Sequence, residues 1–164
     1  MGHSGMMRVA TLLAIGILGL GASWITTRHY ARGGWYLAVQ KDRFSGQTTC
    51  TITTGRVSLV RDTLIFRLGR NALTADAHFR VDGGPVRSVR EVLALDEARG
   101  FFPDRGWIED PSESEVAIPV SYARDARTVW IQANPRSTPR AFRLRGLGYI
   151  LRAAAGLGCP PRTT

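Results

Sequence analysis

His78 is the histidine best placed for chemistry in this chain of 164 residues. It falls within the stretch 73–82, beside Asp76 and Arg80 on the polar side of an alternating pattern, where an imidazole could act as a general base. A serine hydrolase would also need a nucleophile, and no Gly-x-Ser-x-Gly sequence is present to locate one. A zinc site would need three or four ligands, and the spacing of His, Cys and carboxylate residues does not supply them. We therefore expect no catalytic residue, cofactor or metal, and a hydrolase with dispersed active residues is the alternative.

The only two cysteines, Cys50 and Cys159, could form one long-range disulfide. Cys50 lies in a threonine-rich stretch expected to be a strand, and Cys159 follows a predicted helix near the end of the chain. A bond between them would close a loop of about 100 residues and contribute roughly 4 to 5 kcal/mol through chain entropy. Because such bonds persist in oxidising compartments, the pair predicts an exported domain. Two buried free thiols are the alternative.

Arginine dominates the charge of the chain. The formal net charge is +9, and Lys41 is the one lysine among 22 basic residues. All 13 acidic residues lie between Asp42 and Asp125, so the stretch that follows is purely basic. A surface of one sign attracts partners of the other, which here means anionic lipid, lipopolysaccharide or nucleic acid.

The stretch 140–145, "RAFRLR", is the part of this basic region that most resembles a binding surface. Alternation predicts a strand with Phe142 buried and with Arg143 and Arg145 exposed on a rigid support. The same sheet could also expose Arg80 and Arg67. Guanidinium groups bind phosphate and carboxylate in a bidentate manner. The candidate anion-binding residues are therefore Arg143, Arg145 and Arg80, and a merely solvated face is the alternative.

Residues 9–25 form an apolar segment of 17 residues without a charge, which at 1.5 Å per helical residue can reach across the hydrocarbon of a membrane. We expect residues 1–25 to be a signal peptide or a transmembrane anchor, 26–34 a linker and 160–164 a tail. The folded domain would then lie in the periplasm or on the periplasmic side of the inner membrane. Arg28 and Arg32 follow the segment and only Arg8 precedes it closely, which is the reverse of the positive-inside preference. A cytoplasmic-facing protein that binds nucleic acid is therefore a second alternative.

Apolar and polar residues alternate through much of the stretch 35–159, which predicts strands. The pattern is clearest in 73–82, where the odd positions are apolar, and it ends in a turn at 82–85 whose glycines can take positive φ. Pro119 cannot donate a ladder hydrogen bond, so its strand is expected at a sheet edge. The other predicted strands are 35–39, 49–54, 57–60, 64–69, 116–120, 128–133 and 140–145.

Two helices are expected among these strands. In 88–100, Ser88 and Glu91 have the spacing of a capping box. Both this stretch and 146–158 carry an apolar stripe at helical spacing. The predicted fold class is mainly β: an antiparallel β-sandwich or flattened barrel with two short helices, preceded by an N-terminal apolar helix. The stripes consist of Val89, Val92 and Leu93 in the first helix and Leu147, Ile150, Leu151 and Ala154 in the second.

The stretch 140–153, "RAFRLRGLGYILRA", resembles the closing segment of the invasion-associated locus B family, bacterial envelope proteins in which a strand with a phenylalanine leads through a glycine into an aliphatic and alanine helix. The stretch 78–84, "HFRVDGG", is similar to a strand of that family that ends in an aspartate and glycine turn, and Trp35 fits its domain start. The resemblance implies an exported β-sandwich-like module without an established catalytic site. We therefore expect a non-enzymatic cell-envelope protein with a binding or structural role, whose partner is anionic lipid, lipopolysaccharide or an envelope protein.

Overall fold

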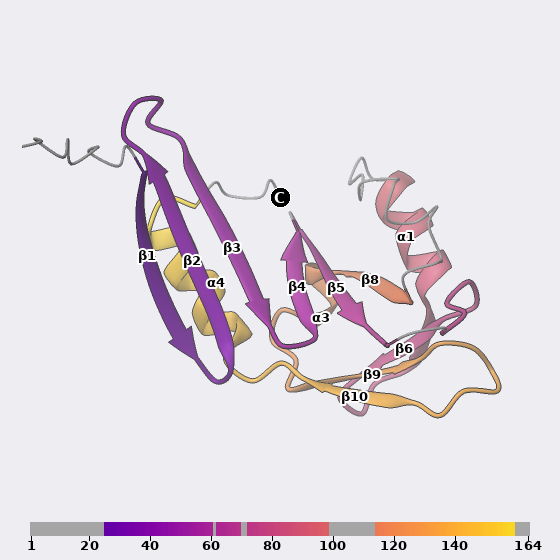
Figure 1. The fold of residues 1–164 in the computed structure, drawn as a ribbon. Coiled ribbons are helices and arrows are strands. Elements are labelled where there is room, and N and C mark those ends of the chain that lie inside the picture. Colours follow the sequence, from indigo (N-terminus) through magenta and orange to yellow (C-terminus); the bar gives the residue numbers. More distant parts are fainter. Residues whose placement is uncertain (1–24, 61, 70–71, 99–113, 160–164) are drawn as a thin grey trace, which may run out of the picture.

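The computed structural model describes residues 25–60, 62–69, 72–98 and 114–159, which form two antiparallel β-sheets (Figure 1). The prediction of a mainly β fold with antiparallel sheets is confirmed. The apolar segment 1–24, with its expected helix, and the tail 160–164 lie outside the described residues. The strand order of the larger sheet is β1 (Ile25–Arg32), β2 (Trp35–Asp42), β3 (Thr48–Thr54), β4 (Val57–Val60), β5 (Thr63–Arg67) and β8 (Glu115–Pro119). The strand order of the smaller sheet is β10 (Arg140–Arg143), β9 (Thr128–Gln132), β6 (His78–Val81) and β7 (Val86–Ser88).

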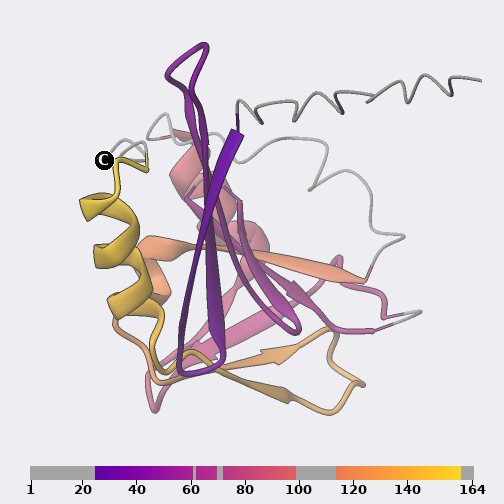
Figure 2. The same ribbon diagram turned by 60° about the vertical axis from the view of Figure 1, so that its left-hand side comes forward.

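The inner face of the larger sheet is covered in two parts (Figures 1 and 2). Helix α4 (Leu147–Gly156) packs against β1 and β2. The smaller sheet covers the other end, where the ring of Phe66 on β5 meets that of Phe142 on β10 edge to face at 5.1 Å. Apolar side chains from both sheets and from α4 therefore share one core. Its most deeply buried members include Trp35, Leu37, Phe66, Phe79, Val129 and Leu147.

Strand β1 corrects the expectation that residues 26–34 form a linker. All eight of its residues are in register with β2, from Ile25 opposite Asp42 to Arg32 opposite Trp35. Gly33 and Gly34 join the two strands with φ values of +60° and +85°, as a two-residue hairpin turn with positive φ at both positions requires. The strand was missed because it lies at the sheet edge and is mostly exposed, so it carries no alternating apolar pattern.

The glycine at position 33 allows the connection between β10 and α4 to pass close to the β1–β2 turn. A Cβ atom at Gly33 would lie 2.5 Å from the carbonyl oxygen of Arg145. Gly33→Ala should therefore lower the free energy of unfolding by about 1–3 kcal/mol in urea titration, because it combines left-handed backbone strain with a backbone clash. Gly83→Ala is the matched control, since no atom lies within 4 Å of a Cβ at that site. Equal stability of the two variants would show that the connection does not lie against the turn.

The strand predicted over 73–82 is shorter than expected. Only His78–Val81 form β6, because Ala77 N–H donates to Thr74 O at 3.0 Å in a turn that precedes the strand. Leu73 is consequently 74% exposed, the opposite of what alternation predicts. The turn after β6 also differs from the expectation: Asp82, with φ of +49°, takes the left-handed conformation expected of the glycines.

The other predicted elements are confirmed. For most of the boundaries that the structure describes, the predicted and observed positions differ by no more than two residues. Strand β8 carries Pro119 and lies at the edge of the larger sheet, as the missing N–H requires. Helix α1 (Val89–Ala98) begins after Ser88, whose Oγ accepts a hydrogen bond from Glu91 N–H at 3.4 Å. The unpredicted elements β7 and α3 (Val120–Ala123) are too short to show a period. Among the described residues, none of the helices is long and apolar enough to span a membrane.

The Cys50–Cys159 disulfide is present, with a Cα–Cα distance of 5.8 Å. Cys50 lies on β3 opposite the buried Val39, and therefore points to the inner face of the larger sheet. Cys159 follows α4, and its N–H donates to Ala154 O at 3.1 Å. The bond therefore fastens the end of α4 to the sheet that this helix covers, as the sequence predicts.

Candidate functional site

The candidate site is the outer face of the smaller sheet, where Arg80, Val86, Trp130 and Arg143 form what we call the arginine–tryptophan face. In the sheet register, Arg80 on β6 lies opposite Trp130 on β9 and opposite Val86 on β7. Arg143 lies at the end of β10, opposite Thr128. Four strands thus bring these side chains together from distant parts of the sequence.

Alternation along the strands turns these residues away from the core. Their neighbours Phe79, Val129, Ile131 and Phe142 are buried between the sheets. Because successive side chains point to opposite faces of a strand, the residues between them face outward. Arg80 and Arg143 are exposed, and Trp130 and Val86 are 39% and 65% exposed. A broad aromatic side chain therefore stands beside two displayed positive charges.

The spacing of the two arginines suits a surface that carries several negative charges. Arg80 and Arg143 are two strands and two residues apart, so ordinary sheet geometry places their Cα atoms about 12 Å apart. Trp130 lies between them, directly opposite Arg80 and diagonal to Arg143. Each guanidinium group can therefore bind its own phosphate or carboxylate group while the indole ring contacts the apolar part of the same partner.

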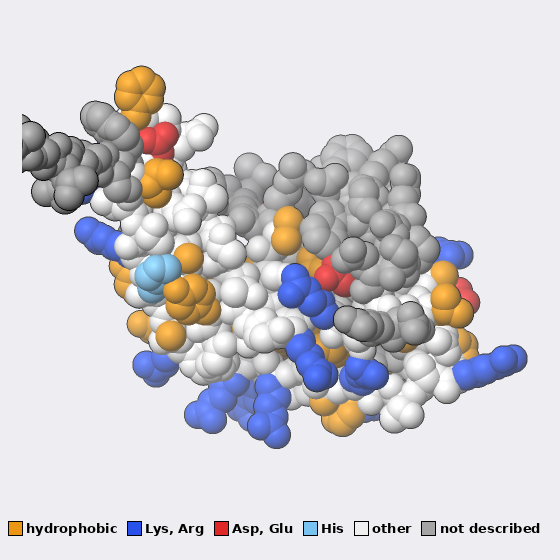
Figure 3. Space-filling model, in the orientation of Figure 1, with side chains coloured by type: hydrophobic (Ala, Val, Ile, Leu, Met, Phe, Trp, Pro, Cys, Tyr) orange, Lys and Arg blue, Asp and Glu red, His pale blue; other side chains and the backbone are white. Residues whose placement is uncertain are grey.

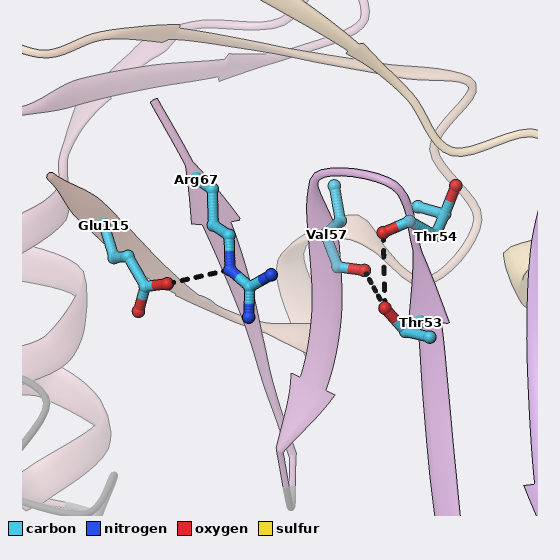
Figure 4. A network of polar contacts seen from close by, with 5 residues as sticks. All are labelled: Thr53, Thr54, Val57, Arg67 and Glu115. Carbon is cyan, nitrogen blue, oxygen red and sulfur yellow. Dashed lines mark hydrogen bonds and ion pairs between the residues drawn. The ribbon is translucent and has the colours of Figure 1, made fainter. Parts of the chain in front are cut away.

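The charges of this face are not neutralised within the part of the chain that the structure describes. Neither Arg80 nor Arg143 makes an ion pair or a side-chain hydrogen bond with any residue in 25–60, 62–69, 72–98 or 114–159. Arg67 lies on the larger sheet, which corrects its expected place beside Arg80. Unlike Arg80 and Arg143, it has an ionic partner: its Nε donates a hydrogen bond to Glu115 Oε1 at 3.0 Å (Figure 4). Arg80 and Arg143, which have no partner among the described residues, are therefore candidates to bind an external anion.

Asp82 is the acidic residue at the end of β6, and its carboxylate is occupied by the backbone. Its Oδ1 accepts hydrogen bonds from Arg127 N–H at 3.1 Å and from Thr128 N–H at 2.8 Å. These bonds fasten the β6–β7 turn to the start of β9. Asp82 thus stabilises the face without forming an ion pair with Arg80 or Arg143.

Arg145 does not share this face, although alternation along 140–145 predicts that it should. Strand β10 ends at Arg143, and Arg145 lies in the connection to α4, beside Gly33 of the β1–β2 turn. Its side chain is exposed there. In the space-filling view, basic side chains follow the lower edge of the molecule over β9, β10 and the β1–β2 turn (Figure 3). Arg145 therefore extends the basic region rather than the arginine–tryptophan face.

His78 lies one residue from the buried Phe79 on β6 and is half-buried. Its Nδ1 lies 2.9 Å from the backbone carbonyl oxygen of Asp76, with which it forms a hydrogen bond. The described residues contain no group of three or more His, Cys, Asp or Glu side chains that could hold a metal ion. The imidazole of His78 is thus bonded to the backbone two residues before it.

Trp130 and Val86 were missed as members of the site. For Trp130 the pattern in "TVWIQ" was sufficient, because buried positions at Val129 and Ile131 require the residue between them to face outward. For Val86 no pattern existed, since β7 has only three residues.

Comparisons with known proteins found no matching family model, no match among curated proteins and no match among solved structures.

Proposed function

We propose that this protein is a non-enzymatic component of the bacterial cell envelope that binds the phosphate groups of an anionic amphiphile, a lipid or lipopolysaccharide, through its arginine–tryptophan face. The observation that carries the proposal is the exposed Trp130 between Arg80 and Arg143, whose charges have no partner among the described residues. Arginine and tryptophan together suit a partner with a charged headgroup and an apolar body.

The disulfide and the apolar segment support an exported location. A disulfide such as Cys50–Cys159 persists where the environment is oxidising, as it is in the periplasm. The uncharged residues 9–25 have the length that an export signal or an anchor needs. Two independent features of the chain thus favour the envelope, where anionic lipid and lipopolysaccharide are abundant partners.

The double variant Arg80→Gln/Arg143→Gln should lose most of the binding to anionic vesicles and to lipopolysaccharide. The chain from Ile25 onward would be measured by co-sedimentation with phosphatidylglycerol vesicles, neutral phosphatidylcholine vesicles and lipopolysaccharide aggregates. The parent should bind both anionic materials and weaken as salt is added, because exposed charges are screened within about 8 Å at physiological ionic strength. Thermal stability should be nearly unchanged, since surface substitutions usually cost less than about 0.5 kcal/mol.

Arg56→Gln/Arg124→Gln is the matched control, because it removes the same charge from two exposed residues outside the smaller sheet. It should retain binding. If both double variants lose binding equally, net charge and not this face is responsible. Loss of binding to only one of the two anionic materials would identify which source of phosphate the face selects.

A further inference from the structure

The tip of the β2–β3 hairpin presents the most exposed large apolar side chain among the described residues. Phe44 is 87% exposed, and it follows Lys41 and Arg43 in the sequence. In both ribbon views the hairpin projects beyond the rest of the described chain (Figures 1 and 2). An apolar side chain at a projecting tip, with basic residues beside it in the sequence, suits contact with a partner that has an apolar interior and an anionic surface.

The hairpin tip is held in one conformation by Asp42. The Asp42 carboxylate accepts hydrogen bonds from Phe44 N–H at 2.8 Å and from Ser45 Oγ–H at 2.6 Å. The backbone of Asp42 also bonds to Gly46 N–H and to Gln47 O, each at 2.9 Å. The hydrogen bonds from Ser45 and from Phe44 N–H lower the pKa of Asp42 below its ordinary value of 3.8, because both bonds favour the charged carboxylate. Little conformational freedom is therefore lost when Phe44 binds a partner.

This tip lies where the apolar segment meets the fold. Ile25, the last residue of the uncharged stretch 9–25, is the first residue of β1 and lies opposite Asp42. Thr26 Oγ1 donates to Lys41 O at 3.4 Å, which joins the same two strand ends. Residues opposite each other on antiparallel strands have Cα atoms about 4.5 to 5.5 Å apart. If the segment enters a membrane, the hairpin tip must lie at the surface of that membrane.

We propose that the hairpin tip, residues 41–46 together with Ile25, docks on the lipid bilayer that the apolar segment enters. Phe44 inserts among the acyl chains, and Lys41 and Arg43 contact lipid phosphate groups at the interface. The charge of Asp42 is compatible with this position because its oxygens already accept hydrogen bonds within the turn. The site is separate from the arginine–tryptophan face and does not depend on it.

The docked orientation has a consequence for the rest of the domain. The hairpin tip and the strands β9 and β10 lie at opposite ends of the described chain in both ribbon views (Figures 1 and 2). When the hairpin tip is docked on the bilayer, the arginine–tryptophan face therefore points away from that bilayer. That face is then free to bind anionic material other than the lipid of its own anchoring membrane.

The test places a polarity-sensitive fluorophore beside the tip of the full chain. Gln47→Cys introduces a third cysteine, which can be labelled selectively because Cys50 and Cys159 are bonded to each other. The labelled chain is reconstituted in nanodiscs of equal parts phosphatidylglycerol and phosphatidylcholine, with or without bromine on the acyl chains. Arg136→Cys, exposed between β9 and β10, carries the control label. The label at position 47 should be blue-shifted and quenched by brominated lipid, and the label at position 136 should not.

Phe44→Ala in the Gln47→Cys background should remove most of the quenching without changing Tm, because the Phe44 side chain is almost fully exposed. Unquenched emission at position 47, or quenching that persists in Phe44→Ala, would overturn the proposal. A blue shift insensitive to bromine would also overturn it, since a protein partner or a second copy would then cover the tip. Quenching only at position 136 would overturn it while leaving the proposed anion binding intact.

Discussion

Replacing Cys159 with serine should produce the largest loss of stability of any single substitution considered for this protein. The Cys50–Cys159 bond closes a loop across a sequence separation of 109 residues. For a loop of that size, chain entropy contributes about 4 to 5 kcal/mol at 25 °C, and native strain can only reduce this. At roughly 4 °C per kcal/mol for a domain of this size, Tm should fall by as much as about 15–20 °C. Calorimetry of the parent and the variant measures the difference directly.

Three controls separate the bond from the side chains. Cys50→Ser and the double variant should match Cys159→Ser, because each removes the same single bond, and reduction of the parent should have a similar effect. The parent should resist thiol alkylation until it is reduced. Freely alkylated thiols in unreduced protein taken from an oxidising compartment would contradict the bond.

The position of the bond explains why α4 should be affected most. The helix contacts the larger sheet through one buried stripe, formed by Leu147, Ile150 and Ala154. Short amphipathic helices are marginal without tertiary packing. The disulfide keeps the end of α4 beside β3, so its loss should expose the amides of α4 to hydrogen exchange before those of the sheets.

Phe142→Ala should be the second most damaging change, with a loss of about 3–5 kcal/mol in the free energy of unfolding. Phe142 on β10 is 6% exposed, and its ring meets that of Phe66 on β5 at 5.1 Å, so it joins the smaller sheet to the larger one. Truncation removes buried apolar surface, opens a cavity and ends an edge-to-face aromatic contact. Urea titration measures the loss.

Two neighbouring substitutions calibrate this result. Arg143→Ala changes the next residue on the strand, whose side chain is exposed, and should stay within about 0.5 kcal/mol. Phe142→Leu retains most of the apolar volume and should be intermediate. If Phe142→Ala costs no more than Arg143→Ala, β10 does not pack on β5 and the two sheets do not share a core.

The sequence by itself determined the class of fold, the disulfide and the direction in which most side chains point. A chain with only two cysteines allows one intramolecular pairing. Where a strand lies between water and a core, an alternating pattern predicts which of its faces is buried. Phe142 and Phe79 were predicted to be buried, and Arg80 and Arg143 exposed, for that reason. The apolar stripes of α1 and α4 were equally informative, because a helix that covers a sheet must bury one face.

Only the tertiary structure decided which strands are neighbours, and therefore which residues form the site. Alternation says on which side of its own strand an arginine lies, but hydrogen bonds between distant segments decide to which sheet the strand belongs. Those bonds placed Arg80 and Arg143 around Trp130, and they left Arg67 on the other sheet beside Glu115. The polar edge strand β1 also depended on its partner, because a strand that buries little surface has no pattern of its own and forms through backbone hydrogen bonds to β2.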